Sequence, residues 1–220
     1  RLSNPASNEA LLDAAAKRVV DAGFDLKALM RSILRSHTYQ RSSLSLAENR
    51  GEYKYLSRYY PRRLMAEVLL DGIDQVLQTS TVFNELAFPG ADKQKTDFYK
   101  QGTRAIELFD ASVNSYFLKT FGRNPREITC ECERSSEPSL VQVLHLSNGE
   151  TLNPKLADQK NRIARLIEAK ESDVSIVQKL FQAALSREAS ESELGQLLEI
   201  RSEYGEDRVT ALQDIAWSIL

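Results

Sequence analysis

The segment YYPRRLMAEVLLDGIDQVLQ, residues 59–78, decides the class of fold that the sequence predicts. Its apolar residues recur every three or four positions, as they do on one face of an α-helix. They are Leu64, Val68, Leu69, Ile73, Val76 and Leu77. Pro61 suits the first turn of a helix, because a backbone N–H there has no partner within the helix. The segment therefore predicts an amphipathic helix that begins near Pro61.

The same spacing occurs twice before this segment. Residues 7–23, SNEALLDAAAKRVVDAG, predict a helix with Ser7 as its N-cap and Gly23 just after its end. Residues 24–40 predict a second helix that Asp25 caps, with one apolar stripe along it. Because the connection is very short, we expect the two helices to form a hairpin.

Helical patterns return after Pro138. One helix should end at Asn148-Gly149, and Ser172 or Asp173 should cap another. Ser190 and Glu193 form the capping-box pattern. The segments expected to be helical are 139–149, 152–170, 172–187, 190–205 and 207–220.

The middle of the chain is less regular. Residues 79–104 predict a long loop, 104–110 a short extended piece, and 115–122 a short helix closed by Gly122. Residues 123–137 are irregular or extended. No sustained alternation of apolar and polar residues predicts a large sheet. We therefore expect an all-α, orthogonally packed multi-helix domain with long irregular loops and at most a small extended element near residues 103–132.

The totals are those of a globular domain. The chain has 220 residues, with 42% hydrophobic and 27% charged. We expect one helical domain over residues 1–220, with a possible subdivision into 1–122 and 123–220. Because the chain begins at Arg1 and ends inside a predicted helix, we expect it to be a fragment of a larger protein.

Charge and hydropathy argue against two classes of partner. Lys and Arg number 29 against 31 Asp and Glu, for a net charge of −2. A nucleic-acid-binding protein normally carries a basic excess, so we expect no nucleic-acid partner. No apolar run approaches the roughly 20 residues that span a bilayer, so we expect no membrane span.

Both cysteines lie in the segment TCECERSSEP, residues 129–138, which leaves several interpretations open. A disulfide between Cys130 and Cys132 would need a tight bend and would be strained. In a metal site the two thiolates would be joined by His145, with His37 as a fourth ligand. The thiols can also pack as small apolar groups, or cycle between thiol and disulfide. Buried structural thiols or a local disulfide are the interpretations that we favour.

Arginine and aromatic residues gather in the irregular segments, where binding residues concentrate. Arginine–carboxylate pairs such as Arg134 with Glu127 or Glu133 would also serve as clamps on long loops, and we favour the clamp. No catalytic motif such as G-x-S-x-G or H-E-x-x-H is present, so we predict no catalytic residues. The candidate binding residues are Arg62, Arg63, Arg104, Tyr116, Arg123, Arg126, Cys130, Cys132, Glu133 and Arg134.

Several long stretches, taken in order, resemble a known family. They include YYPRRLMAEVLLDGIDQV, GTRAIELFD, SYFLKTFGRNPRE and TCECERSSEPSLVQVLHLSNGETLN. They resemble the planctomycete-type C-terminal domain of unknown function that follows cytochrome-c-like domains in large secreted bacterial proteins. CECERSSEP resembles that family's central motif, which makes Cys130, Cys132, Glu133 and Arg134 the leading site candidates.

The resemblance implies an exported, periplasmic or extracellular, multidomain parent with a c-type haem in another domain. The segment CECER lacks the C-x-x-C-H pattern of haem attachment, so we expect no haem in this fragment. Export implies an oxidising compartment, which favours the Cys130–Cys132 disulfide. We expect a non-catalytic binding or scaffold module whose partners are the other domains of the parent or an extracellular polysaccharide. The alternative is a redox or hydrolytic enzyme part in which Cys130 and Cys132 act with the haem domain.

Overall fold

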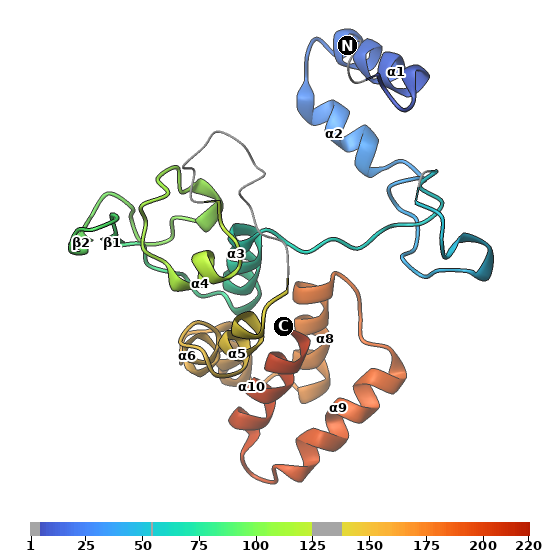
Figure 1. The fold of residues 1–220 in the computed structure, drawn as a ribbon. Coiled ribbons are helices and arrows are strands. Elements are labelled where there is room, and N and C mark those ends of the chain that lie inside the picture. The colour runs from blue at the N-terminus through green and yellow to red at the C-terminus, as the bar shows by residue number, and fades with distance from the viewer. Residues whose placement is uncertain (1–4, 54, 125–137) are drawn as a thin grey trace. The chain divides into compact units, whose positions relative to one another are not determined.

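The computed structural model describes residues 5–53, 55–124 and 138–220. The chain forms two compact units, Unit 1 (Arg1–Arg62) and Unit 2 (Arg63–Leu220) (Figure 1). The described residues confirm the expected all-α class, since the only strands among them are the two-residue strands β1 (Glu85–Leu86) and β2 (Gln94–Lys95). None of the helices described is long and apolar enough to cross a membrane.

Unit 1 contains the expected helical hairpin, α1 (Glu9–Asp21) and α2 (Leu26–Leu34). Asn8, rather than Ser7, caps α1: its side chain accepts a hydrogen bond of 3.0 Å from the backbone N–H of Leu11. Asp25 caps α2 as expected. The connection turns through Gly23 and Phe24, which have φ values of 62° and 63°, in the left-handed region.

The rest of Unit 1 is a loop with one 3₁₀ turn, η1 (Ala47–Asn49), and Glu52 organises part of it. The Glu52 carboxylate accepts hydrogen bonds from the backbone N–H of Tyr55, the Ser57 hydroxyl and the Tyr60 hydroxyl. These bonds, that of Tyr55 foremost, lower the pKa of Glu52 to about 2. The Tyr53 and Tyr60 rings stack with centroids 5.3 Å apart.

Unit 2 is built around helix α3 (Ala66–Leu77). Its start near Pro61 was predicted wrongly, because Met65 is extended and residues 61–64 are not helical. Leu64 is 60% exposed, whereas Ala66 and Leu70 are fully buried. The helix therefore begins where core contacts begin, since packing supplies most of a helix's stability.

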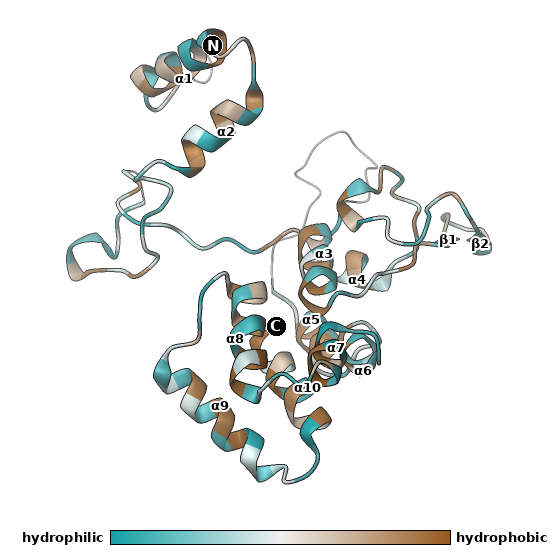
Figure 2. Cartoon of the chain, turned by 180° about the vertical axis from the view of Figure 1, so that it is seen from behind, coloured by the Kyte–Doolittle hydropathy of each residue, from teal (hydrophilic) through white to brown (hydrophobic). Residues whose placement is uncertain are grey.

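The remaining helices of Unit 2 are α4 (Tyr116–Thr120), α5 (Leu140–Asn148), α6 (Leu152–Ala157), α7 (Arg162–Glu168), α8 (Asp173–Leu185), α9 (Glu191–Glu203) and α10 (Arg208–Ile219). Helix α3 packs against α4, α6, α7 and α8, and α10 packs against α6 to α9. Figure 2 shows the apolar residues of α3, α8 and α10. The core of Unit 2 thus contains side chains from both sides of position 122, among them Leu70, Leu118, Ile163, Leu180 and Leu212.

The small sheet lies before residues 103–132, the region in which the sequence predicted an extended element. β1 and β2 pair antiparallel within the segment expected to be a loop, and Val113 adds only an isolated bridge to Leu86. The expectation that residues 104–110 are extended was wrong, because they contain the 3₁₀ turn η2 (Ala105–Glu107). Asp71 of α3 accepts hydrogen bonds of 2.6 and 3.0 Å from the backbone N–H groups of Ala105 and Ile106, which fastens this turn to α3.

The sequence predicted one helix over residues 152–170, but the structure has two, α6 and α7. Asn161, only 1% exposed, separates them. Its side-chain nitrogen donates to the carbonyl oxygens of Lys155 and Leu156, and its oxygen accepts from the N–H of Ala164. It therefore binds the last carbonyls of α6 and caps α7. The predicted helix C-termini at Gly122 and Gly149 are confirmed, and so are the predicted N-caps Ser172 and Ser190.

Candidate binding site

Gln142, 9% exposed, holds helix α5 in place. Its side-chain nitrogen donates a 3.0 Å hydrogen bond to the carbonyl oxygen of Thr120, at the end of α4. Its side-chain oxygen accepts from Nη1 of Arg63 at 3.0 Å and from the N–H of Ser139 at 3.3 Å. One amide thus joins α5 to α4 and to the residues before α3. A buried group with both ends bonded has a fixed orientation.

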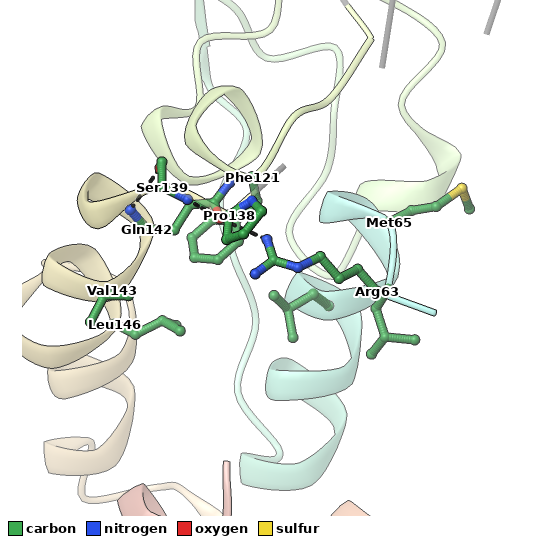
Figure 3. Close-up of a pocket in the computed structure, with 10 residues that line it drawn as sticks. Arg63, Met65, Phe121, Pro138, Ser139, Gln142, Val143 and Leu146 are labelled. Carbon is green, nitrogen blue, oxygen red and sulfur yellow. Dashed lines mark hydrogen bonds between the residues drawn. The ribbon is translucent and has the colours of Figure 1, made fainter. Parts of the chain in front are cut away.

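A pocket of about 270 Å³, the α5 pocket, opens beside Gln142 (Figure 3). It is lined by Arg63, Leu64, Met65, Leu69, Phe121, Pro138, Ser139, Gln142, Val143 and Leu146. Most of these side chains are apolar, and Arg63 is the one charged side chain among them. Its guanidinium has five N–H groups in a planar fork that matches a carboxylate. The pocket therefore suits an apolar group next to a carboxylate.

A second pocket, of about 380 Å³, surrounds His145 of α5. His145 Nε2 lies 2.9 Å from the Thr151 hydroxyl, and its ring lies 5.1 Å from that of Tyr116 and 5.7 Å from that of Phe117 between centroids. Burial lowers the pKa of His145, and the nearby charge of Glu150 opposes that shift. A neutral imidazole in this setting acts as a packing and hydrogen-bonding group.

Gly149 closes α5 against the same histidine. A Cβ atom at this position would lie 2.1 Å from the carbonyl oxygen of His145 and 2.7 Å from its Nδ1. No side chain fits there without moving the backbone, so the end of α5 requires glycine.

Two of the candidate arginines form ion pairs with carboxylates. Arg123 forms an ion pair with Glu67, with 3.9 Å between Nε and Oε1, and both side chains are less than 10% exposed. It also donates a 2.8 Å hydrogen bond to the carbonyl oxygen of Asp110. Arg104 pairs with Glu107 at 3.1 Å on the surface. Arg123 therefore holds the segment around Asp110 against α3, whereas the Arg104–Glu107 pair lies within one exposed turn.

The other candidates are distributed as follows. Arg63 lines the α5 pocket and Tyr116 lines the His145 pocket. Arg62 belongs to Unit 1, where it lines a groove. Arg126, Cys130, Cys132, Glu133 and Arg134 lie outside the described residues. The disulfide, metal and redox interpretations of the cysteines therefore remain predictions, and the described residues contain no group of three potential metal ligands.

The sequence did not single out the apolar walls of the α5 pocket, nor Gln142. Its signal was present, because Ser139 and Gln142 form a capping box, an S-x-x-Q pattern before an apolar run. Phe121, Val143 and Leu146 carried no comparable signal, since any exposed apolar residue has the same local pattern.

The comparisons with known proteins concern the family only. No curated protein and no solved structure matches the chain. The model of the family PSD1, described as a protein of unknown function (DUF1553), matches residues 1–200. Because the match covers 200 of the 220 residues, the chain belongs to this DUF1553 family.

Proposed function

We propose that this domain is a non-catalytic binding module of an exported multidomain protein, and that it docks other domains of that protein. The observation that carries the proposal is the α5 pocket. It combines apolar walls with the Arg63 guanidinium, in a frame that Gln142 fixes through hydrogen bonds to two neighbouring segments. Rigid, apolar pockets with one oriented charged group are typical of binding sites.

The lining favours a polypeptide ligand. An apolar side chain would fill the space between Leu69, Val143 and Leu146, and an adjacent carboxylate would take the remaining donors of Arg63. A polysaccharide presents many hydroxyl groups, each of which needs a hydrogen-bond partner when it is buried. Because most of the wall is apolar, we place the polysaccharide second.

The wider context in this proposal comes from the family resemblance. Export to the periplasm or outside the cell, a c-type haem domain elsewhere in the parent, and partners within the same protein are parts of the proposal. The motif CECERSSEP ends at Pro138, which lines the α5 pocket. The motif and the pocket are therefore adjacent in the chain, which supports a common binding role.

The test compares two valines of one helix. Val143 is 58% exposed and lines the pocket, whereas Val141 is 50% exposed and does not. Binding of the parent's other domains to the 220-residue chain is measured by calorimetry. Val143→Asp should weaken binding at least about tenfold, which is about 1.4 kcal/mol, while Val141→Asp should leave it unchanged. Equal affinity of the two variants, or pocket-dependent binding of a glycan instead, would contradict the proposal.

A further inference from the structure

Unit 1 carries a groove of about 710 Å³ along its helical hairpin, which we call the hairpin groove. Its apolar walls include Leu11 and Ala15 of α1 and Leu29 and Ile33 of α2. Arg18, Arg58 and Arg62 also line it. All of its lining residues belong to Unit 1, so the groove is a property of that unit alone.

The apolar side chains along the groove are open to contact. Leu11 is 64% exposed and Ile33 is 47% exposed. Among the described residues of Unit 1, none is buried, although both helices carry apolar stripes. Figure 2 marks the apolar residues along α1 and α2 in brown. A large exposed apolar surface rimmed by charge marks a site of protein interaction.

Two of the three arginines that line the groove are held in position. Nε of Arg18 donates a 2.7 Å hydrogen bond to the hydroxyl of Ser32 in α2. The guanidinium carbon of Arg58 lies 4.5 Å from the centroid of the Tyr60 ring, a cation–π arrangement. Arginines held in this way lose little side-chain freedom when a carboxylate binds to them.

The positive charge is local to Unit 1. Residues 1–62 contain 11 Lys and Arg but 6 Asp and Glu, a net charge of +5, while the whole chain is −2. Residues 63–220 therefore carry −7. An acidic partner would be attracted to the groove and repelled by the remainder of the chain. The negative remainder disfavours nucleic acid and anionic membranes, whose charge extends over a large surface.

The dimensions match one helix. α1 has 13 residues, which at about 1.5 Å per residue is about 20 Å. A partner helix of three to four turns would lie along this length with its apolar face in the groove, a common recognition mode. Its flanking positions would face Arg18, Arg58 and Arg62.

We propose that the hairpin groove binds an acidic amphipathic helix of a partner protein. Leucines at helical spacing would contact the apolar walls, and glutamates beside them would pair with the three arginines. This inference uses Unit 1 only and does not depend on the α5 pocket.

The experiment uses the 220-residue chain and two synthetic helices of about 14 residues, a length taken from the span of α1. Both carry leucines at i, i+3, i+4 and i+7, and one has glutamates where the other has lysines. Binding is followed by fluorescence anisotropy at several salt concentrations. We expect the glutamate helix to bind at least about tenfold more tightly than the lysine helix. We also expect its affinity to fall as salt rises.

Adjacent residues supply a matched control. Ile33 lines the groove and Leu34 does not, yet they are 47% and 48% exposed on the same helix. Ile33→Asp should abolish binding of the glutamate helix, while Leu34→Asp should reduce it less than about twofold. Arg62→Gln should weaken binding of the glutamate helix and reduce the salt dependence of that binding. Arg35→Gln, which removes a charge outside the groove, should have smaller effects on both.

Three results would overturn the inference. They are equal binding of the glutamate and lysine helices, no binding of either, and equal effects of Ile33→Asp and Leu34→Asp. Analytical ultracentrifugation of the same chain adds a fourth. A dimer that Ile33→Asp dissociates would show that a second copy occupies the groove.

Discussion

Unit 1 and Unit 2 use the same element, the amphipathic helix, in two different ways. In Unit 2 the apolar face of α3 is buried against four other helices, and Leu70 and Leu77 are fully inaccessible. In Unit 1 the apolar faces of α1 and α2 stay exposed, and the hairpin is held by caps at Asn8 and Asp25 and by the bond from Arg18 to Ser32. Among the described residues, Unit 2 therefore has a buried core and Unit 1 has none.

This difference supports the separate roles that we propose for the two units. A surface that is already packed is unavailable to a partner, whereas an amphipathic surface left open gains stability when a partner covers it. Unit 2 contains the α5 pocket, and Unit 1 contains the hairpin groove with its exposed apolar residues. Mutations in the two units should consequently affect different measurements.

The largest contrast should come from apolar truncation. Leu70→Ala removes a fully buried side chain of α3 and should lower the free energy of unfolding of Unit 2 by about 2–5 kcal/mol. Ile33→Ala, on the exposed face of α2, should change stability by less than about 0.5 kcal/mol. Urea denaturation followed by circular dichroism measures both. Similar losses would show that Ile33 is covered in the chain.

The second largest contrast should be the stability lost when an N-cap is removed from each unit. Asn161→Ala breaks three hydrogen bonds and leaves buried carbonyl groups unpaired, so it should cost about 2–3 kcal/mol. Asn8→Ala removes one exposed cap and should cost about 1 kcal/mol, seen as fraying of α1. Thermal unfolding and the NMR shifts of α1 distinguish the two. If Asn161→Ala costs no more than Asn8→Ala, Asn161 does not join α6 to α7.

A smaller effect concerns pH and Unit 2. Because burial lowers the pKa of folded His145 below its ordinary 6.5, the unfolded chain binds a proton more readily. The free energy of unfolding should therefore fall as pH drops below about 6.5, and level off below the folded pKa. His145→Gln should remove this slope. A slope that His145→Gln leaves unchanged would assign it to another group.

The smallest expected effect is in the loop of Unit 1. The pKa of Glu52 is lowered to about 2, so its ionised form stabilises the loop fully above about pH 4.5. That contribution should be lost as pH falls from 4.5 towards 2. Tyrosine fluorescence should report this step, because Tyr55 and Tyr60 bond to Glu52. If a Glu52→Gln variant keeps this change in fluorescence, the change belongs to another carboxyl group.

The fold class was predictable because local signals agree with the tertiary structure. Caps at Asp25, Ser172 and Ser190 and the helix end at Gly149 need only neighbouring residues, and all of them are found. The misplaced start of α3 and the division at Asn161 have a different origin. Both are decided by which residues reach the core, and local sequence does not contain that information.

The candidate site was predictable only in part, for the same reason. Arg63 and Tyr116 were chosen because arginine and aromatic residues in irregular segments are frequent in sites, and both line pockets. Arg123 also lies in an irregular segment of the sequence, but it is buried against Glu67, where it joins two segments. Only the tertiary neighbours of an arginine distinguish a clamp from a binding residue. Helical periodicity likewise predicts an apolar stripe, but not what covers it.

The central claim is that the apolar faces of Unit 1 are open in the free chain, while those of Unit 2 are closed. Hydrogen exchange of the 220-residue chain, followed by mass spectrometry, tests it most directly. Amides of α1 and α2 should exchange far faster than those of α3, α8 and α10, and should slow when the acidic helix is added. Equal protection of α1, α2 and α3 in the free chain would contradict the claim, because it would mean that the hairpin is already covered.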